Sequence, residues 1–106
     1  MRVLLFSNNV HQEGKTLVTV RRGSKWADLD VGQEIGIRAV GFADIRVACI
    51  LFVHKCRLGD IPEHMLASEH DINCRTLVGL QRELERVYDD SIDLDETVTV
   101  VGYVLS

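Results

Sequence analysis

Alternation of apolar and polar positions predicts strands along most of this chain. Short apolar or alternating runs that are rich in β-branched residues are typical of strands. Five segments fit this description: residues 2–7, 16–22, 34–40, 44–54 and 97–105. The fourth carries apolar residues on both faces, so we expect it to lie in the centre of a sheet. Its odd-numbered positions from Ile45 to Val53, which include Cys49, are predicted to form its core face.

Helical spacing predicts two helices between the last two strands. Residues 61–67 carry Pro62 in their first turn, which is typical of a short helix. A longer helix has apolar residues at helical spacing from Leu77 to Tyr88 and charged residues on its outer side. Strands followed by helices, with a hairpin around residues 41–44, indicate an α+β fold with a mostly antiparallel, barrel-like sheet.

The composition is that of an ordinary globular protein, and we expect residues 1–106 to form one domain. Hydrophobic residues make up 46% of the chain and charged residues 26%. No apolar run approaches the ~20 residues of a membrane-spanning helix, and the first residues do not match a secretory signal peptide. Three cysteines form no paired framework, which favours a reduced, cytoplasmic protein without membrane attachment.

Charge is distributed unevenly along the chain. Residues 1–57 contain nine Lys or Arg against five Asp or Glu, whereas residues 58–106 contain three against eleven. This asymmetry could give an acidic protein a positive face for a polyanion. In the alternative interpretation, the acidic half is a solvated helix and loop, and the acidic segment from Asp89 to Glu96 is a solvated connector.

Residues 13–23 hold the most distinctive chemistry. Gly-Lys-Thr at 14–16 looks like the end of a phosphate-binding loop, but Asn9 stands where that loop needs its first glycine, and a strand pattern follows. Thr19 and Arg21 share one face of the strand, where Arg21 could hold a carbonyl or phosphate oxygen. A desolvated Lys15 could act as a base toward Thr19. The alternative is a charged edge strand that prevents aggregation.

Several other side chains are candidates for contact with a ligand. The candidate soft metal ligands are His54, Cys56, His64 and His70. Their spacing is not that of a zinc site, so we expect neither a metal nor a cofactor. Trp26 is expected either to pack beside Leu29 or to stack on a base. Phe42 stands at a hairpin tip, where an exposed aromatic ring indicates a contact. Cys74 precedes the last helix and is expected to be exposed.

The order of these short motifs resembles the ASCH domains, a branch of the PUA-like fold. A Thr-x-Arg pair follows the first strand, and residues 30–33 (Asp-Val-Gly-Gln) open the next one. A short helix at Asp-Ile-Pro (60–62), a helix ending in Tyr88 and a closing strand at 97–100 complete the pattern. The resemblance covers nearly the whole chain. It implies a small, roughly barrel-shaped, mostly antiparallel sheet with flanking helices.

The resemblance also implies a cleft for a nucleobase or RNA. Some members of this family are amidohydrolases that deacetylate N4-acetylcytidine, and others bind or cleave RNA. Carried over to this chain, the catalytic residues would be Lys15, Thr19 and Glu69, with Asp71 as the alternative acid. Arg21, Arg22 and Lys25 would bind the substrate, which is a nucleoside or RNA. The other hypotheses are a non-catalytic RNA- or nucleotide-binding module and an interaction protein with a vestigial cleft.

Overall fold

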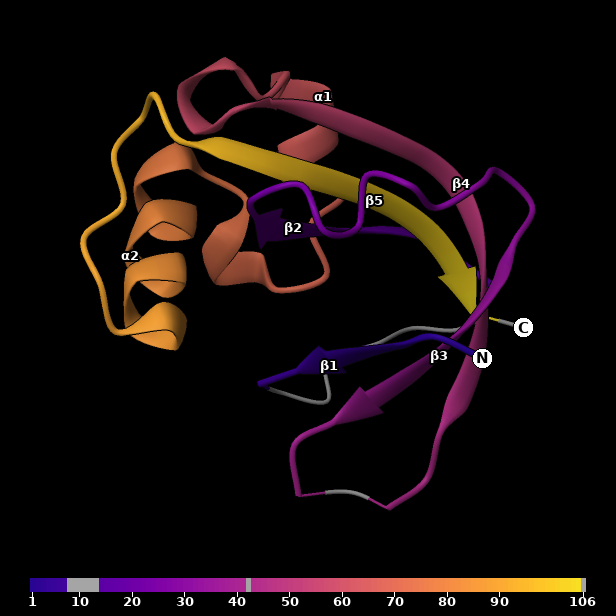
Figure 1. Cartoon of the computed structure of the whole chain (residues 1–106). Coiled ribbons are helices and arrows are strands. Elements are labelled where there is room, and N and C mark those ends of the chain that lie inside the picture. The colour runs from indigo at the N-terminus through magenta and orange to yellow at the C-terminus, as the bar shows by residue number, and fades with distance from the viewer. Residues whose placement is uncertain (8–13, 42, 106) are drawn as a thin grey trace.

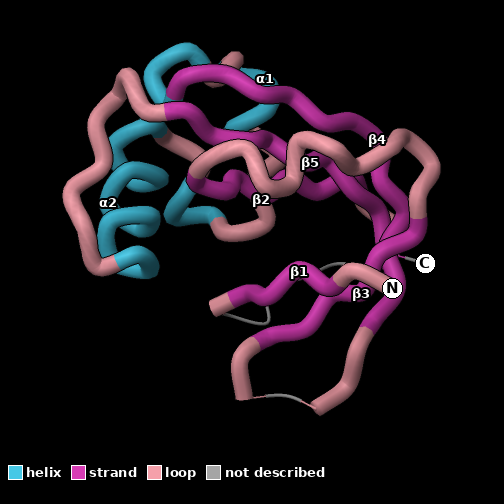
Figure 2. Tube along the Cα trace, viewed as in Figure 1, coloured by secondary structure: helices cyan, strands magenta, loops and turns pink. Residues whose placement is uncertain are grey.

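The computed structural model describes residues 1–7, 14–41 and 43–105, and these residues form a curved sheet with helices on one side (Figure 1). The strands are β1 (Val3–Phe6), β2 (Thr16–Arg22), β3 (Glu34–Ala39), β4 (Arg46–Arg57) and β5 (Thr97–Leu105). The helices are α1 (Glu63–Leu66) and α2 (Leu77–Tyr88), with short 3₁₀ turns at Leu58–Asp60 and Ile72–Cys74. The predicted α+β class is confirmed (Figure 2).

The five strands form one mixed sheet in the order β1-β3-β4-β5-β2. β1 pairs with β3 in parallel, whereas the β3–β4, β4–β5 and β5–β2 pairs are antiparallel. β4 lies in the centre, as its two apolar faces predicted. The prediction of a barrel is wrong, because β1 and β2 are the two edges of the sheet and do not pair with each other.

A segment after α1 explains why β2 does not pair with β1. The Val18 N–H donates to the Ser68 carbonyl at 2.9 Å, and the His70 N–H donates to the Val18 carbonyl at 2.9 Å. These bonds make a parallel bridge between Val18 and Glu69. Because backbone groups at the β2 edge are already satisfied there, they cannot bond to β1, and the sheet stays open along this side.

Two hydrophobic clusters lie on opposite faces of the sheet. The strand cluster contains Leu4, Phe6, Leu17, Leu29, Ile35, Ile37, Ala48, Ile50, Val101, Tyr103 and Leu105. The helix cluster contains Val18, Val20, Leu58, Ile61, Leu66, Cys74, Leu80, Leu84, Ile92, Val98 and Val100. Residues of β2 alternate between the two clusters, as period-two spacing requires. Thr19 and Arg21 therefore share the face of Leu17, and Arg22 shares the face of Val20.

The face prediction for the long strand is wrong for the part of β4 before a bulge, where even-numbered positions and not odd-numbered ones are buried. The register with β5 shifts between Ile50 and Phe52, so alternation reverses at that point. Ala48 and Ile50 belong to the strand cluster before the bulge, and Val53 packs against it afterwards. Cys49, predicted to lie in the core, is only half-buried.

The helices differ from prediction mainly at their ends. α1 begins after Pro62, which is its N-cap, and is shorter than the predicted 61–67. In α2 the Thr76 hydroxyl accepts the Gly79 N–H, and Asp89 ends the helix in the left-handed conformation at φ 50°. Among the described residues, no helix is long and apolar enough to span a bilayer.

Candidate functional site

A cleft opens between the two edge strands, next to α2. Aliphatic side chains of α2 form one wall, and aromatic and charged side chains form the rest. The chemically informative lining residues are Phe6, Thr19, Arg21, Glu69, His70 and Tyr88. The cavity volume is about 70 Å³, which is well below the ~300–1,000 Å³ of pockets that enclose a drug-sized ligand. The enclosed part can therefore hold only the edge of a larger molecule.

Thr19 and Arg21 reach this cleft together because they are two positions apart on β2. Thr19 is 2% exposed, and its hydroxyl oxygen accepts the Arg21 Nε–H at 3.2 Å. Arg21 Nη1 donates to the Leu5 carbonyl of β1 at 2.6 Å. The guanidinium carbon lies 4.5 Å from the centroid of the Phe6 ring. Arg21 thus spans the two unpaired sheet edges and is held in a fixed orientation at the cleft.

Glu69 enters the cleft from the segment that covers β2, and one of its oxygens is unsatisfied. The residue is 1% exposed. Oε1 accepts the Asp71 N–H at 3.3 Å and faces Nδ1 of His70. Oε2 has no hydrogen-bond partner among the described residues. A buried polar atom without a partner costs ~1–3 kcal/mol, and more when charged, so its presence calls for an explanation.

Asp71, the alternative acid, also lines the cleft but is used structurally. Its Oδ1 accepts the Asn73 N–H at 3.0 Å and caps the 3₁₀ turn at Ile72–Cys74. Of the two candidate acids, Glu69 is the one with an unsatisfied oxygen.

The sequence indicates His70 only as a candidate metal ligand and does not predict that it contacts the Glu69 carboxylate. Its Nδ1 lies 3.2 Å from the Val18 carbonyl and faces the Glu69 carboxylate. Both neighbours are acceptors, so Nδ1 carries the hydrogen. The imidazole also meets the Phe6 ring edge-on, with 4.9 Å between centroids. The sequence signal for this contact is that His70 directly follows Glu69, a candidate acid. No group of metal-ligating side chains occurs in the described ranges.

Burial and charge interact strongly in the cleft. Burial lowers the pKa of Arg21, and the neighbouring Tyr88, Tyr103 and Glu69 oppose that change. Burial, and then the negative charge of Glu69, raises the pKa of Tyr103 well above its usual range.

Cys74, predicted to be exposed, is buried, because the 3₁₀ turn directs it under α2. Its burial and three nearby carboxylates raise its pKa to about 12, so the thiol is unreactive at neutral pH.

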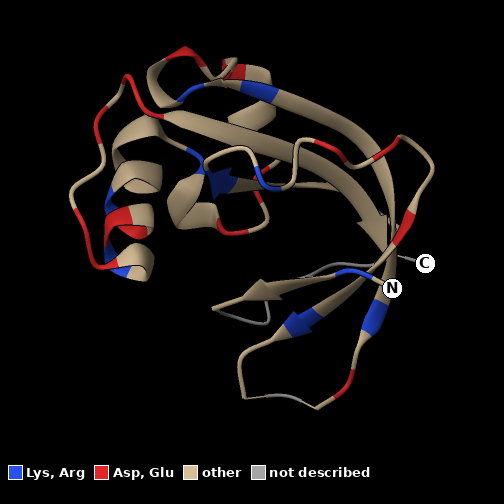
Figure 3. Ribbon diagram, in the orientation of Figure 1, with Lys and Arg blue, Asp and Glu red and all other residues tan. Residues whose placement is uncertain are grey.

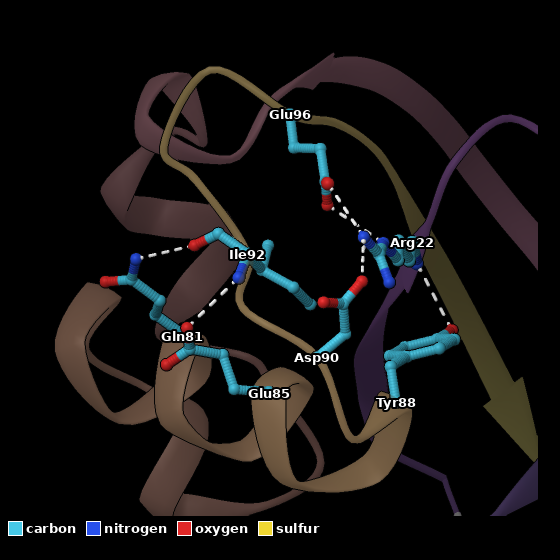
Figure 4. A network of polar contacts seen from close by, with 7 residues as sticks. All are labelled: Arg22, Gln81, Glu85, Tyr88, Asp90, Ile92 and Glu96. Carbon is cyan, nitrogen blue, oxygen red and sulfur yellow. Dashed lines mark hydrogen bonds and ion pairs between the residues drawn. The ribbon is translucent and has the colours of Figure 1, made fainter.

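Arg22 does not line the cleft. Alternation along β2 places it on the face opposite Arg21, and Figure 4 shows its guanidinium directed toward Glu96 and Asp90. Its guanidinium donates to Glu96 at 2.8 and 2.9 Å and to Asp90 at 3.0 Å. These hydrogen bonds raise its pKa. The Arg22 backbone N–H donates to the Tyr88 hydroxyl at 3.3 Å. This network orients Tyr88, whose ring lines the cleft.

The acidic connector is therefore not simply solvated. Two of its carboxylates pair with Arg22, and its Ile92 backbone is tied to α2. The Ile92 N–H donates to Glu85 at 3.0 Å, and the Ile92 carbonyl accepts from Gln81 at 2.8 Å (Figure 4). Figure 3 shows that acidic residues gather along this loop, while several Lys and Arg lie on the strands.

Lys15 lies outside the cleft, in a second hollow. It precedes β2, which pairs with β5 from Thr16 to Arg22 without a register shift. No bulge therefore brings Lys15 closer to Thr19, and four residues of extended chain span roughly 13 Å. The structure brings together Thr19, Glu69 and Arg21 but leaves Lys15 apart from them.

Lys25 and Trp26 form a separate surface cluster. Trp26 packs against the strand cluster that includes Leu29, as one of the two interpretations predicted. The Lys25 ammonium lies 5.3 Å from the Trp26 ring centroid, and the Arg2 guanidinium lies 4.4 Å from it. Neither Lys25 nor Trp26 lines the cleft. Phe42 lies outside the described residues.

Comparison with known proteins identifies the fold. No protein-family model matches the chain, and no curated protein matches it either. A crystal structure of an ASCH domain from Lactobacillus crispatus JV V101 matches with a TM-score of 0.64 and 14% sequence identity. The match covers 84% of this chain and 63% of that one. The chain therefore has an ASCH-like, PUA-like fold, and at this identity the likeness concerns the fold alone.

Proposed function

We propose that the cleft binds a nucleobase, presented by a nucleoside or by RNA. The observation that carries this proposal is the buried Glu69 carboxylate, whose Oε2 has no partner among the described residues. It lines the same small cavity as the Arg21 guanidinium and the Thr19 hydroxyl. A ligand with an N–H group would satisfy the orphan oxygen and remove the cost of burying it unpaired.

The chemistry of the cleft fits the edge of a base. Carboxylates accept hydrogen bonds from the amino group of cytosine, and arginine donates to carbonyl oxygens of bases. A planar heterocycle with an N–H beside a carbonyl could therefore use Glu69 and Arg21 together. The rings of Phe6 and Tyr88 and the aliphatic wall of α2 offer apolar surfaces of the kind on which unstacked bases pack.

The size of the cavity also supports a base. A volume of about 70 Å³ admits the hydrogen-bonding edge of a ring and leaves a sugar outside. The ASCH-like fold adds support by analogy, since the resemblance implies a nucleobase or RNA cleft in this fold.

Titration of the protein with the four ribonucleosides, followed by NMR of assigned backbone amides, tests the proposal. We expect one nucleoside to shift the amides around Thr19, Arg21 and Glu69. Arg21→Met should weaken its binding at least tenfold, because a guanidinium donor in a partly desolvated site is removed. Arg82→Met is the matched control, because Arg82 is exposed and does not line the cleft. If no nucleoside shifts these amides, the proposal is wrong.

A second candidate function is amide hydrolysis of N4-acetylcytidine or a similar acylated base. The observation in its favour is Thr19, a buried residue with a hydroxyl that lines the same cleft as Glu69. The Thr19 hydroxyl oxygen would attack the acyl carbon while Glu69 takes its proton. The C–N bond to the base would then break as that proton passes to the departing amine, and water would hydrolyse the acyl-threonine to release acetate. Lys15, distant from the cleft, is not in position to share this task.

The hydrolysis is tested by following loss of the acetyl group from N4-acetylcytidine. Thr19→Val removes the hydroxyl but keeps the shape of the side chain, and it should abolish turnover while nucleoside binding persists. Absence of turnover in the unaltered protein at high concentration would leave binding as the function.

A further inference from the structure

A second hollow beside the cleft has a positive lining. Its volume is about 450 Å³, and its lining contains the cations Lys15 and Arg75, together with His70 and Ser68, with no carboxylate among the residues that the structure describes. Lys15 and Arg75 are both exposed. In a protein of net charge −4, a hollow whose described lining holds two cations is a local exception.

The two cations are available to a ligand. The Lys15 ammonium has no hydrogen bond or ion pair with the described residues. Toward the part of the chain that the structure describes, Arg75 uses only Nε, which donates to the Glu69 carbonyl at 3.0 Å. This bond orients the guanidinium and leaves its terminal N–H groups for an oxyanion, which arginine binds well through its planar fork.

The hollow and the cleft share a wall. His70 lines both, and Glu69 contributes its carboxylate to the cleft and its carbonyl to Arg75. A ligand whose uncharged edge lies on Glu69 and Arg21 would therefore extend past His70 toward Lys15 and Arg75.

We propose that this hollow binds a phosphate group attached to the base in the cleft, so that the ligand is a nucleotide or a single-stranded oligonucleotide and not a free nucleoside. This inference rests on the proposed function, because the cleft fixes where the base lies. It also gives Lys15, which stands apart from Thr19, a role in the neighbouring hollow.

The experiment measures the affinity of the protein for the nucleoside that binds best and for the 3′,5′-bisphosphate of the same nucleoside. We expect the bisphosphate to bind more tightly. Lys15→Ala and Arg75→Ala should each remove about fivefold of that gain, the value of one ion pair at ~4 Å in water. Nucleoside affinity should not change in Lys15→Ala. Lys55→Ala and Arg82→Ala are the matched controls, because both residues are exposed and lie outside the hollow.

Salt dependence gives a second readout. For a single-stranded trinucleotide, the slope of log affinity against log salt should become shallower by about 0.7 in Lys15→Ala and in Arg75→Ala, because each variant neutralises one phosphate fewer. Tighter binding of the trinucleotide than of the bisphosphate identifies a strand as the ligand, and equal binding identifies a free nucleotide. Either result supports the phosphate site, provided that the affinity for the ligand falls in Lys15→Ala.

The two proposals fail in different ways. If the nucleoside binds and the bisphosphate gains nothing, or the gain survives in Lys15→Ala, the phosphate site is wrong and the cleft stands. Titration with inorganic phosphate tests the hollow alone, through the amides of residues 15–17 and 68–75. If phosphate shifts these amides but no nucleoside shifts those of Thr19 and Glu69, the base cleft is wrong and the hollow stands as an anion site.

Discussion

Replacement of Glu69 by glutamine should make the protein more stable and a weaker binder. The side chain is 1% exposed, and Oε2 has no partner among the described residues. An unsatisfied buried polar group costs ~1–3 kcal/mol, with charged groups toward the upper end. Glutamine has the same shape, keeps an oxygen for the Asp71 N–H, and carries no charge.

The expected gain can be worked out from these contacts. Removing the buried charge, whose Oε2 has no hydrogen-bond partner among the described residues, should recover ~2 kcal/mol, while the bond from His70 loses charge assistance worth ~1 kcal/mol. The net stabilisation is about 1 kcal/mol, or a rise in Tm of roughly 4–8 °C for a domain near this size. Binding should weaken at least tenfold, because the amide presents N–H groups where the carboxylate accepted them.

Urea denaturation and nucleoside titration of the same samples measure both effects. Glu63→Gln is the control: it removes an exposed carboxylate, so its stability should stay within ~0.5 kcal/mol of the unaltered protein. A Glu69→Gln protein that is less stable by about 1 kcal/mol or more would refute the reasoning. That outcome would mean that the carboxylate stabilises the fold and is not held unsatisfied for a ligand.

Three further predictions concern the fold around the cleft. Gly102→Ala would place a methyl group 2.1–2.6 Å from atoms of the Phe52 ring, so urea denaturation should show a loss of ~1–3 kcal/mol that Phe52→Leu partly restores. Arg22→Met should speed amide hydrogen exchange in residues 90–96; unchanged exchange would show that its ion pairs do not hold the connector. The raised pKa of Cys74 means that the folded state holds this proton more tightly, so stability is kept below pH 9 and falls as pH rises toward 12. Cys74→Ala should flatten this decline between about pH 9 and pH 10.5 in urea titrations, and an identical decline would contradict it.

The sequence predicted the elements well where the pattern is local. The bounds of β2 and β5 match the predicted 16–22 and 97–105, and α2 spans the predicted Leu77 to Tyr88. Alternation also placed Thr19 and Arg21 on one face. The same alternation puts Arg22 on the other face, so grouping it with Arg21 as a substrate-binding residue conflicted with the pattern itself.

Only the tertiary structure decided what meets at the cleft. The bulge after Ile50 reverses the faces of β4, and no single-sequence pattern marks one extra residue in an apolar run. Pairing of the Ser68–His70 segment with β2 brings Glu69 beside Arg21, although 48 positions separate them along the chain. Periodicity is fixed by backbone geometry within a few residues and can be read locally. Which distant segments satisfy one another's hydrogen bonds, and which carboxylate oxygen is left without a partner, depends on how the whole chain packs.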